Sequence, residues 1–298
     1  MNSPAQLRPM SQTRPTVEAS TAATVNATQP WRHLGALACL FFWLILGSGA
    51  YLYVQLDTSV SGVYDSIGRL SREQPWFGGL LRSLHRYAAD TFLLLSLLHL
   101  LRELLLGRWN SFRRYAWLTG LPLLAFIYIS DIAGFWLRWD QLAHFSALAT
   151  AEWLDGLGIF ATPLTRNFLT TAAVSDRLFS LLIFMHIGIA LLLLFALWFH
   201  LRRYTRADVF PTRALTLGSL ASLALLALLR PVTSAAAADL GTVPQALALD
   251  WFYLFFHALM PLLSATGLWS LLAVVTLTLL LVPYSMRAGE RRSSPRHG

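Results

Sequence analysis

The chain has 298 residues, of which 56% are hydrophobic and only 13% charged, and this composition is typical of a protein with several membrane spans rather than of a soluble domain. Its formal net charge of +8 comes from 23 basic residues, all of them arginine. Such a charge is compatible with binding to nucleic acid or to anionic lipid. The arginines, however, gather in the segments around the apolar runs, which argues against nucleic-acid binding and predicts an all-α integral membrane protein.

The first thirty residues are rich in Ser, Thr, Ala, Pro and Gln and lack apolar periodicity, so 1–30 is predicted to be a disordered cytoplasmic tail. We expect a four-helix core over 31–205, two further helices over 206–287 and a second cytoplasmic tail over 288–298. The predicted membrane spans run roughly over 34–54, 84–107, 117–137, 178–201, 214–229 and 267–283. Most of them approach the ~20 residues that a bilayer requires.

The distribution of charge predicts how the spans are oriented. Arginines cluster before the first span and after the second, fourth and sixth, whereas the opposite connections carry most of the acids, among them Asp57, Asp140 and Asp250. By the positive-inside rule, both termini are therefore cytoplasmic. We expect a multi-pass protein of a bacterial-type inner membrane, embedded in lipid.

Two spans carry histidines at the same spacing. His85 and His99 are fourteen residues apart in the second span, and His186 and His200 are fourteen apart in the fourth. Fourteen residues of α-helix rise about 21 Å and return to nearly the same face. Each span thus has one histidine near each membrane surface, on one stripe.

The second and fourth spans run in the same direction, so His85 matches His186 in height and His99 matches His200. Each pair could supply both axial ligands of a haem iron in the core of the bundle. A lone histidine in a span is often only a hydrogen-bonded packing residue, but four in a matched rectangle favour a dihaem four-helix bundle. A shared metal ion does not fit ligands about 21 Å apart, because metal–histidine bonds are about 2 Å long.

Glycines and arginines follow the same pattern. Glycines fourteen residues apart in the first and third spans indicate close approach, either of a flat macrocycle or simply of a neighbouring helix. Arg82 and Arg102 flank the histidine stripe and could bind haem propionates or anchor the helix ends at the lipid surface. The four glycines are Gly35, Gly49, Gly120 and Gly134.

At this point the chain resembles the cytochrome b family of bc-type quinol:cytochrome c oxidoreductases. The sequence RSLHR at 82–86 with HLLR at 99–102 is similar to the family's second helix, and GFWLRWDQ at 134–141 is similar to the end of its third. LDWFYLFFHAL at 249–259 resembles the family's P-E-W-Y segment, and LLLVPYSMR at 279–287 resembles the end of its sixth helix. The resemblance covers about residues 31–287.

The resemblance implies two non-covalent b-type haems that carry electrons across the membrane, with quinone or quinol as the substrate. In the family, the acidic residue of the P-E-W-Y segment accepts a proton from quinol on the outer side. Asp250 stands at that position here and is the candidate catalytic base, although an ordinary loop aspartate is the alternative.

Two functions remain compatible with these features. The first is a dihaem cytochrome b subunit of a quinol-oxidising complex, with an iron–sulfur or c-type cytochrome subunit as its redox partner and the possibility of a homodimer. The second is a haem-bearing membrane anchor that connects a different periplasmic dehydrogenase or reductase to the quinone pool. We expect the chain to act in a complex in either case, since its sequence contains no soluble redox domain.

Overall fold

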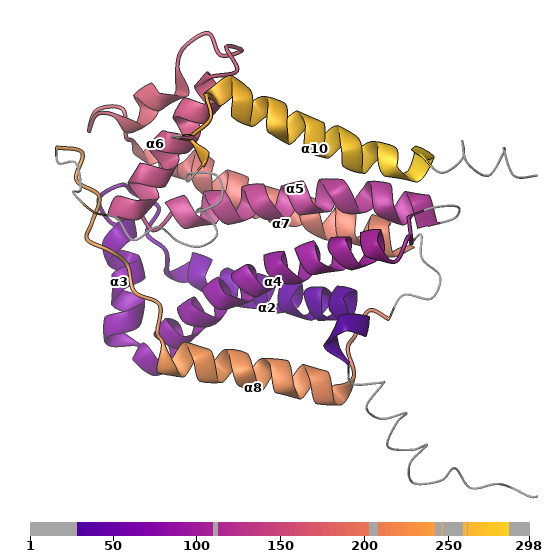
Figure 1. Ribbon diagram of the computed structural model, residues 1–298. Helices are drawn as coiled ribbons and strands as arrows, with labels where there is room; N and C mark the ends of the chain where they lie inside the picture. The colour runs from indigo at the N-terminus through magenta and orange to yellow at the C-terminus, as the bar shows by residue number, and fades with distance from the viewer. Residues whose placement is uncertain are drawn as a thin grey trace, which may run out of the picture.

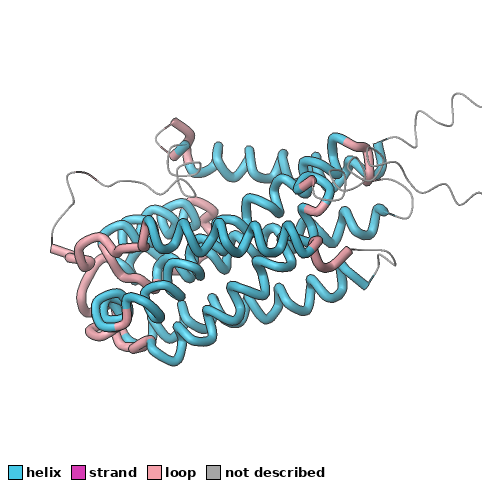
Figure 2. Tube along the Cα trace, turned by 90° about the horizontal axis from the view of Figure 1, so that it is seen from below, coloured by secondary structure: helices cyan, strands magenta, loops and turns pink. Residues whose placement is uncertain are grey.

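The computed structural model describes residues 29–109, 113–202, 208–241, 246, 259–260 and 262–285. Within these ranges the chain is almost entirely helical, and the β-type pairing is limited to an isolated bridge between Asp140 and Ala237. The long helices run side by side along a common axis (Figure 2). The predicted all-helical membrane architecture is therefore confirmed.

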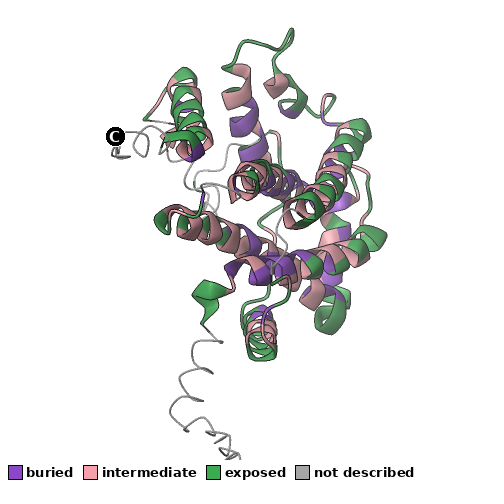
Figure 3. Ribbon diagram, turned by 90° about the vertical axis from the view of Figure 1, so that its right-hand side faces the viewer, coloured by how far each residue is buried: buried purple, intermediate pink, exposed green. Residues whose placement is uncertain are grey.

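Four helices form the core of the molecule: α2 (Leu34–Gln55), α4 (Leu80–Leu105), α5 (Arg114–Trp136) and α7 (Asp176–Arg202). They pack mainly as two pairs, α2 with α4 and α5 with α7. Buried residues gather where these helices meet, and exposed residues cover their outward faces (Figure 3). Because lipid covers such outward faces in a membrane, this pattern suits the apolar sequences of the helices.

Two further long helices flank the core on opposite sides. The helix α8 (Arg213–Leu229) packs against α4, and α10 (Ala265–Ser285) packs against α5 (Figure 1). They correspond to the fifth and sixth predicted spans. Their places beside the core could not be read from the sequence.

The shorter elements lie at one end of the bundle, which we call the outer end, following the topology predicted from the charges. They are α3 (Val63–Glu73), the π-type turn η2 (Pro75–Gly79), α6 (Gln141–Asp155) and the 3₁₀ turn η4 (Leu164–Phe168). The opposite, inner end holds η1 (Pro30–Arg32) and the last turn of α10 (Figure 1). The first and last described elements thus share one end of the molecule.

Four of the described helices, α2, α5, α7 and α10, are long and apolar enough to cross a membrane. With 26 residues α4 is also long enough, but its histidines, arginines and acids lower its hydropathy. α8 is apolar but has only 17 residues. The most polar of the long helices, α4, contacts α2, α5 and α8, so its polar groups can face other helices instead of lipid.

Candidate functional site

The four histidines of the predicted rectangle project from two helices of the core. His85 and His99 lie on α4, and His186 and His200 lie on α7. His85 and His186 line one cavity of about 460 Å³ toward the outer end, which we call the outer cavity. His99 and His200 line a second of about 350 Å³, the inner cavity. Volumes of this size are usual for small-molecule and cofactor sites.

The structure brings the outer histidines together at a spacing that suits one metal ion. The ring centroids of His85 and His186 are 6.2 Å apart. Two metal–nitrogen bonds of about 2 Å, together with roughly 1 Å from each nitrogen to its ring centre, span about 6 Å. The distance therefore fits two imidazoles that bind one metal ion between them.

Hydrogen bonds fix how the outer histidines present their nitrogens. His85 Nδ1 lies 3.1 Å from the carbonyl oxygen of Ile45, and His186 Nδ1 lies 2.8 Å from that of Ser130. A carbonyl only accepts, so each Nδ1 carries the proton and donates it. Nε2 is then the nitrogen with a free lone pair, which is the state that a metal ligand requires.

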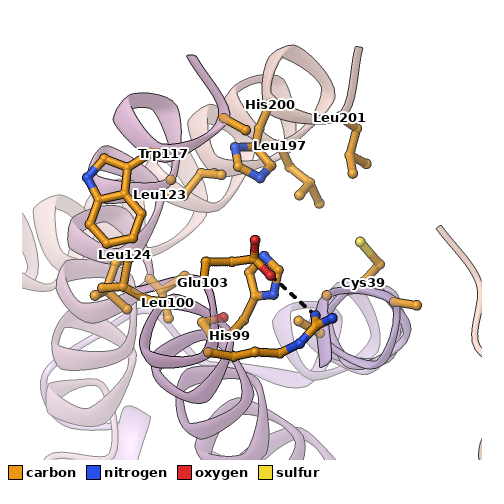
Figure 4. A pocket seen from close by; sticks show the side chains of 18 of the residues that line it. Cys39, His99, Leu100, Glu103, Trp117, Leu123, Leu124, Leu197, His200 and Leu201 are labelled. Atoms are coloured by element: carbon orange, nitrogen blue, oxygen red, sulfur yellow. Dashed lines mark ion pairs between the residues drawn. The ribbon is translucent and has the colours of Figure 1, made fainter. Parts of the chain in front are cut away.

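The inner histidines have fewer partners. Thr119 Oγ1 donates to the Tyr115 carbonyl at 2.7 Å and lies 2.9 Å from His200 Nδ1, so it accepts the imidazole proton. His99 Nδ1 is buried and has no hydrogen-bond partner in the described part of the chain. Figure 4 shows His99 and His200 approaching the inner cavity from different helices.

The predicted glycines lie directly against the histidine rings. A Cβ on Gly134 would come within 2.5 Å of His186 Cε1, and one on Gly49 within 3.0 Å of His85 Cε1. At the inner end the corresponding distances are 3.4 Å for Gly35 and 3.6 Å for Gly120, which is close to ordinary contact. The glycines thus allow the close pairing of α2 with α4 and of α5 with α7, with the ring of each histidine seated on the partner helix.

Arginines lie at both cavities. Arg82 lines the outer cavity, where its guanidinium donates to Ser71 Oγ at 3.0 Å and to Ser234 Oγ at 2.6 Å. Arg102 lines the inner cavity, 3.3 Å from Glu103. Arg108 and Arg113 also reach Glu103, at 3.9 and 3.8 Å. Both the outer and the inner cavity are therefore lined by arginines that could pair with the carboxylates of a cofactor.

The two cavities meet at a thin apolar layer. Phe92, Ile127 and Leu193 line both of them. Since no polar residue is shared between the linings, water is poorly accommodated at this level of the bundle. The arrangement separates two polar sites by a few apolar side chains in the middle of the membrane.

A connection across the outer end lies beside the outer cavity, and its Val232 is part of the cavity lining. We call residues 230–239, which follow α8, the outer strap. Val232 N donates to Ser83 Oγ at 3.0 Å, and Tyr87 Oη donates to the Arg230 carbonyl at 2.6 Å. Asp140, with 1% of its surface exposed, accepts from Ala235 N at 3.1 Å and from Ala143 N at 2.8 Å. Through these bonds the strap is tied to α4 and to the start of α6.

Asp250, the predicted base, lies outside the described residues. The helix that follows its segment, α10, is fixed to α6 by Trp153 and Trp269, whose rings stack at 4.0 Å and 7°. Trp269 Nε1 also donates to the Trp153 carbonyl at 2.9 Å. This contact holds α10 beside the outer end of the core.

Several residues of the site were not singled out by the sequence. The hydroxyl groups of Ser48, Thr119 and Ser130 lie within hydrogen-bond distance of histidine Nδ1 atoms on the neighbouring helix. No pattern in the sequence around these three residues indicates such a contact. Asp90 and Asp131, by contrast, are visible in the sequence as acids inside predicted spans. That feature alone could have marked them.

Comparison with known proteins agrees with this geometry. The family model described as Cytochrome b/b6/petB matches residues 19–206. Among solved structures, a chain of a "Hyperthermophilic respiratory Complex III" superposes with a TM-score of 0.69 at 18% sequence identity, over 90% of this chain and 81% of that one. At this identity the superposition establishes a shared fold.

Proposed function

The chain belongs to the cytochrome b family, and from this membership we propose that it carries electrons across the membrane as the dihaem subunit of a bc-type quinol-oxidising complex. Membership implies that the chain binds haem b. Two haems, a quinol substrate and a redox partner are the further parts of the proposal. Haem iron supplies reversible one-electron chemistry when bound.

The observation that carries the proposal is the paired arrangement of the histidines around two cavities. His85 with His186 would hold the outer haem and His99 with His200 the inner one, each through Nε2. The hydrogen bonds at Nδ1 orient the imidazoles before a metal arrives and fix their tautomer. Arg82 and Arg102 would pair with the propionates at the two ends.

For electron transfer, the protein separates the outer and inner haem sites by a short apolar layer without water. Phe92, Ile127 and Leu193 keep water from the region between the cavities. An electron can therefore pass between the sites without meeting mobile polar groups that would reorganise around it. The direction of travel follows from the substrate side, which we propose to be the outer end.

Asp250 is proposed as the base that accepts a proton from quinol at that end. Asp250→Asn should slow quinol oxidation while leaving the haem content unchanged. Normal turnover in this variant would remove Asp250 from the mechanism without affecting the haem assignment.

We further propose that an iron–sulfur or c-type cytochrome subunit receives the electrons. The assembly would lie in a bacterial-type inner membrane, with both termini cytoplasmic, and could contain two copies of the chain. Co-purification of the chain from its native membrane, followed by metal analysis of the associated subunits, tests the partner. A molybdenum-containing partner would favour an anchor for another enzyme.

The first experiment is to count haems per polypeptide by pyridine haemochrome and to record reduced-minus-oxidised spectra. We expect two b-type haems in the wild type and one in His99→Ala. His144→Ala is the matched control, because His144 lies at the outer end, with Nε2 2.8 Å from the Phe168 carbonyl, and lines neither cavity. No haem in the wild type, or an unchanged count in His99→Ala, would contradict the proposal.

A further inference from the structure

Two aspartates project into the interior of the bundle beside the outer cavity. Asp90 lies on α4, five residues after His85 and therefore closer to the middle of the membrane. Asp131 lies on α5, one turn before Gly134. Both line the outer cavity. Ionisable side chains inside a membrane span are unfavourable unless paired, and they usually mark a functional site.

Two carboxylates lie near the single positive charge of Arg86. Arg86 Nε lies 3.2 Å from Asp90 Oδ2. Arg86 acts on Asp131 as an opposite charge and Asp90 as a like charge, so the two carboxylates share the guanidinium of Arg86. In a medium of low dielectric, a second carboxylate beside one such pair requires a proton or a further positive charge.

The other polar groups around the pair do not supply that charge. Arg138 also lines the outer cavity, but its guanidinium lies 3.5 Å from Asp140 and stacks over the Phe135 ring at 4.0 Å. Tyr128 on α5 interacts with Asp131 electrostatically. The remaining titratable or charged groups of the cavity lining are Tyr53 on α2, Arg82 and His85 on α4, and His186 on α7.

A separate opening reaches Asp90 from the side of the bundle. A cavity of about 630 Å³ between α4, α8 and the outer strap is lined by Arg86, Asp90 and Arg138, which also line the outer cavity. Tyr87, Thr91 and Thr233 add hydroxyl groups to its wall. Polar groups in a cavity of this size can hold water, so Asp90 lies between the outer cavity and a second cavity that reaches the outer strap.

We propose that Asp90 and Asp131 together bind one proton whose uptake and release accompany the electron at the outer site. This inference rests on the proposed function, because the charge that changes is that of a haem held by His85 and His186. When one electron from a reductant enters the outer site, the net positive charge of the oxidised haem is lost, and the pair takes up one proton from water at the outer surface. When the electron leaves, the pair returns that proton to the water.

The coupling predicts how the midpoint potential of the outer haem depends on pH. If one proton accompanies one electron, a tenfold change in proton concentration changes the apparent equilibrium constant tenfold, which is about 59 mV for a one-electron couple. A redox titration of the purified protein, followed by visible spectra between about pH 6 and about pH 8, measures this slope for both haems separately. The potential of the outer haem should fall as pH rises.

Asp131→Asn removes the second carboxylate with almost no change in size, and Asp90→Asn removes the first. Each variant leaves a single carboxylate facing Arg86, so we expect the slope of the outer haem to fall toward zero in both. Asp65→Asn is the matched control, because Asp65 is an exposed aspartate of α3 at the same end of the molecule. That variant should keep the wild-type slope, and the slope of the inner haem should be the same in all three.

Each outcome decides the matter. A flat slope in the wild type overturns the inference whatever the variants do, as does a wild-type slope retained in both Asp90→Asn and Asp131→Asn. If one of these variants fails to assemble, the other carries the comparison. Failure of the proposed function is distinguishable, since it would appear as missing haem in the wild type and not as a changed slope.

Discussion

The outer and inner halves of the bundle each contain one pair of histidines, but the two pairs differ in their hydrogen-bond partners. At the outer end, His85 and His186 each donate to a backbone carbonyl, and serine hydroxyls lie beside both Nδ1 atoms. At the inner end, His200 has the hydroxyl of Thr119, and His99 Nδ1 has no partner in the described chain. The outer histidines are therefore oriented in advance, whereas the inner pair depends more on its ligand for order.

The charges at the two ends differ as well. At the inner cavity, Arg102, Arg108 and Arg113 converge on the carboxylate of Glu103. At the outer end, aspartates accept backbone N–H groups and so fix the loops. The outer end is therefore stabilised by aspartates, whereas arginines surround the inner cavity. We expect substitutions of acids and a fall in pH to affect the outer end more than the inner end.

The largest expected effect comes from a pair of glycines on the same helix. Gly134→Ala should abolish the outer haem, because the new Cβ would lie 2.5 Å from His186 Cε1 and the Ser130 carbonyl holds that ring in place. Gly120→Ala should retain both haems, since its Cβ would lie 3.6 Å from His200 Cε1. It should also strengthen the helix by about 1 kcal/mol. Pyridine haemochrome counts distinguish the two, and equal haem content would contradict the comparison.

The second effect concerns the acid that ties the outer end together. Asp140→Ala removes the N-cap of α6, an acceptor for the outer strap and the ion-pair partner of Arg138. Loss of one partner from such a buried pair destabilises by about 3 to 5 kcal/mol. Thermal unfolding in detergent should show a clear fall in the transition temperature. Asp65→Ala, at an exposed position of α3, is the control and should leave it unchanged.

A smaller effect is expected from removing the hydroxyl groups that lie beside the histidines of the two halves. Thr119→Val removes the hydroxyl beside His200 Nδ1 without changing its size, and we expect about 10- to 100-fold weaker inner haem binding. Ser48→Ala should weaken outer binding less, because His85 Nδ1 keeps the Ile45 carbonyl. The rate of haem transfer to an excess of a haem-scavenging protein measures both. Faster loss from Ser48→Ala than from Thr119→Val would reverse the assignment.

The local part of this architecture could be predicted from the sequence. Apolar runs predict where the helices lie, and the fourteen-residue spacing places the histidines and the glycines on one face of their helices. Both features are properties of a single helix, so they can be read from local sequence. The predicted span 34–54 and the observed Leu34–Gln55 differ only at the end. The predicted start at 84 of the second span missed the polar first turn of α4, which begins at Leu80.

The tertiary part could not be predicted. The glycines were expected to allow close approach of a macrocycle or of a neighbouring helix, but the sequence did not indicate that a histidine ring of the partner helix lies against each of them. The role of Asp140 depends on a strap almost a hundred residues away in the chain, and no local pattern indicates such a contact. The sequence thus indicated the histidines and glycines at the cavities, but neither the hydroxyl and carbonyl groups that hold the histidines in place nor Asp90 and Asp131 in the outer lining.

The smallest predicted effect is a difference in acid sensitivity between the two ends. Asp155 at the end of α6 accepts from Leu164 N at 2.6 Å and from Thr165 N at 3.0 Å, which fixes η4. Burial acts to raise the pKa of this carboxyl, but the two backbone donors outweigh it and the pKa is lowered from 3.8. Because the folded-state pKa lies below that of the unfolded chain, the stabilisation is fully present above about pH 4 and is lost as pH falls through the folded value.

Hydrogen exchange at the Leu164 and Thr165 amides should therefore increase, relative to its intrinsic rate, as pH falls below about 4. Asp155→Asn should show that increase already at neutral pH. Amides in the inner half of α7, whose hydrogen bonds involve no carboxylate, provide the internal control and should keep their protection in the same samples. If protection at Leu164 stays constant down to the lowest pH at which the fold persists, Asp155 does not hold η4, and the acid-stabilised outer end would reduce to Asp140 and its strap.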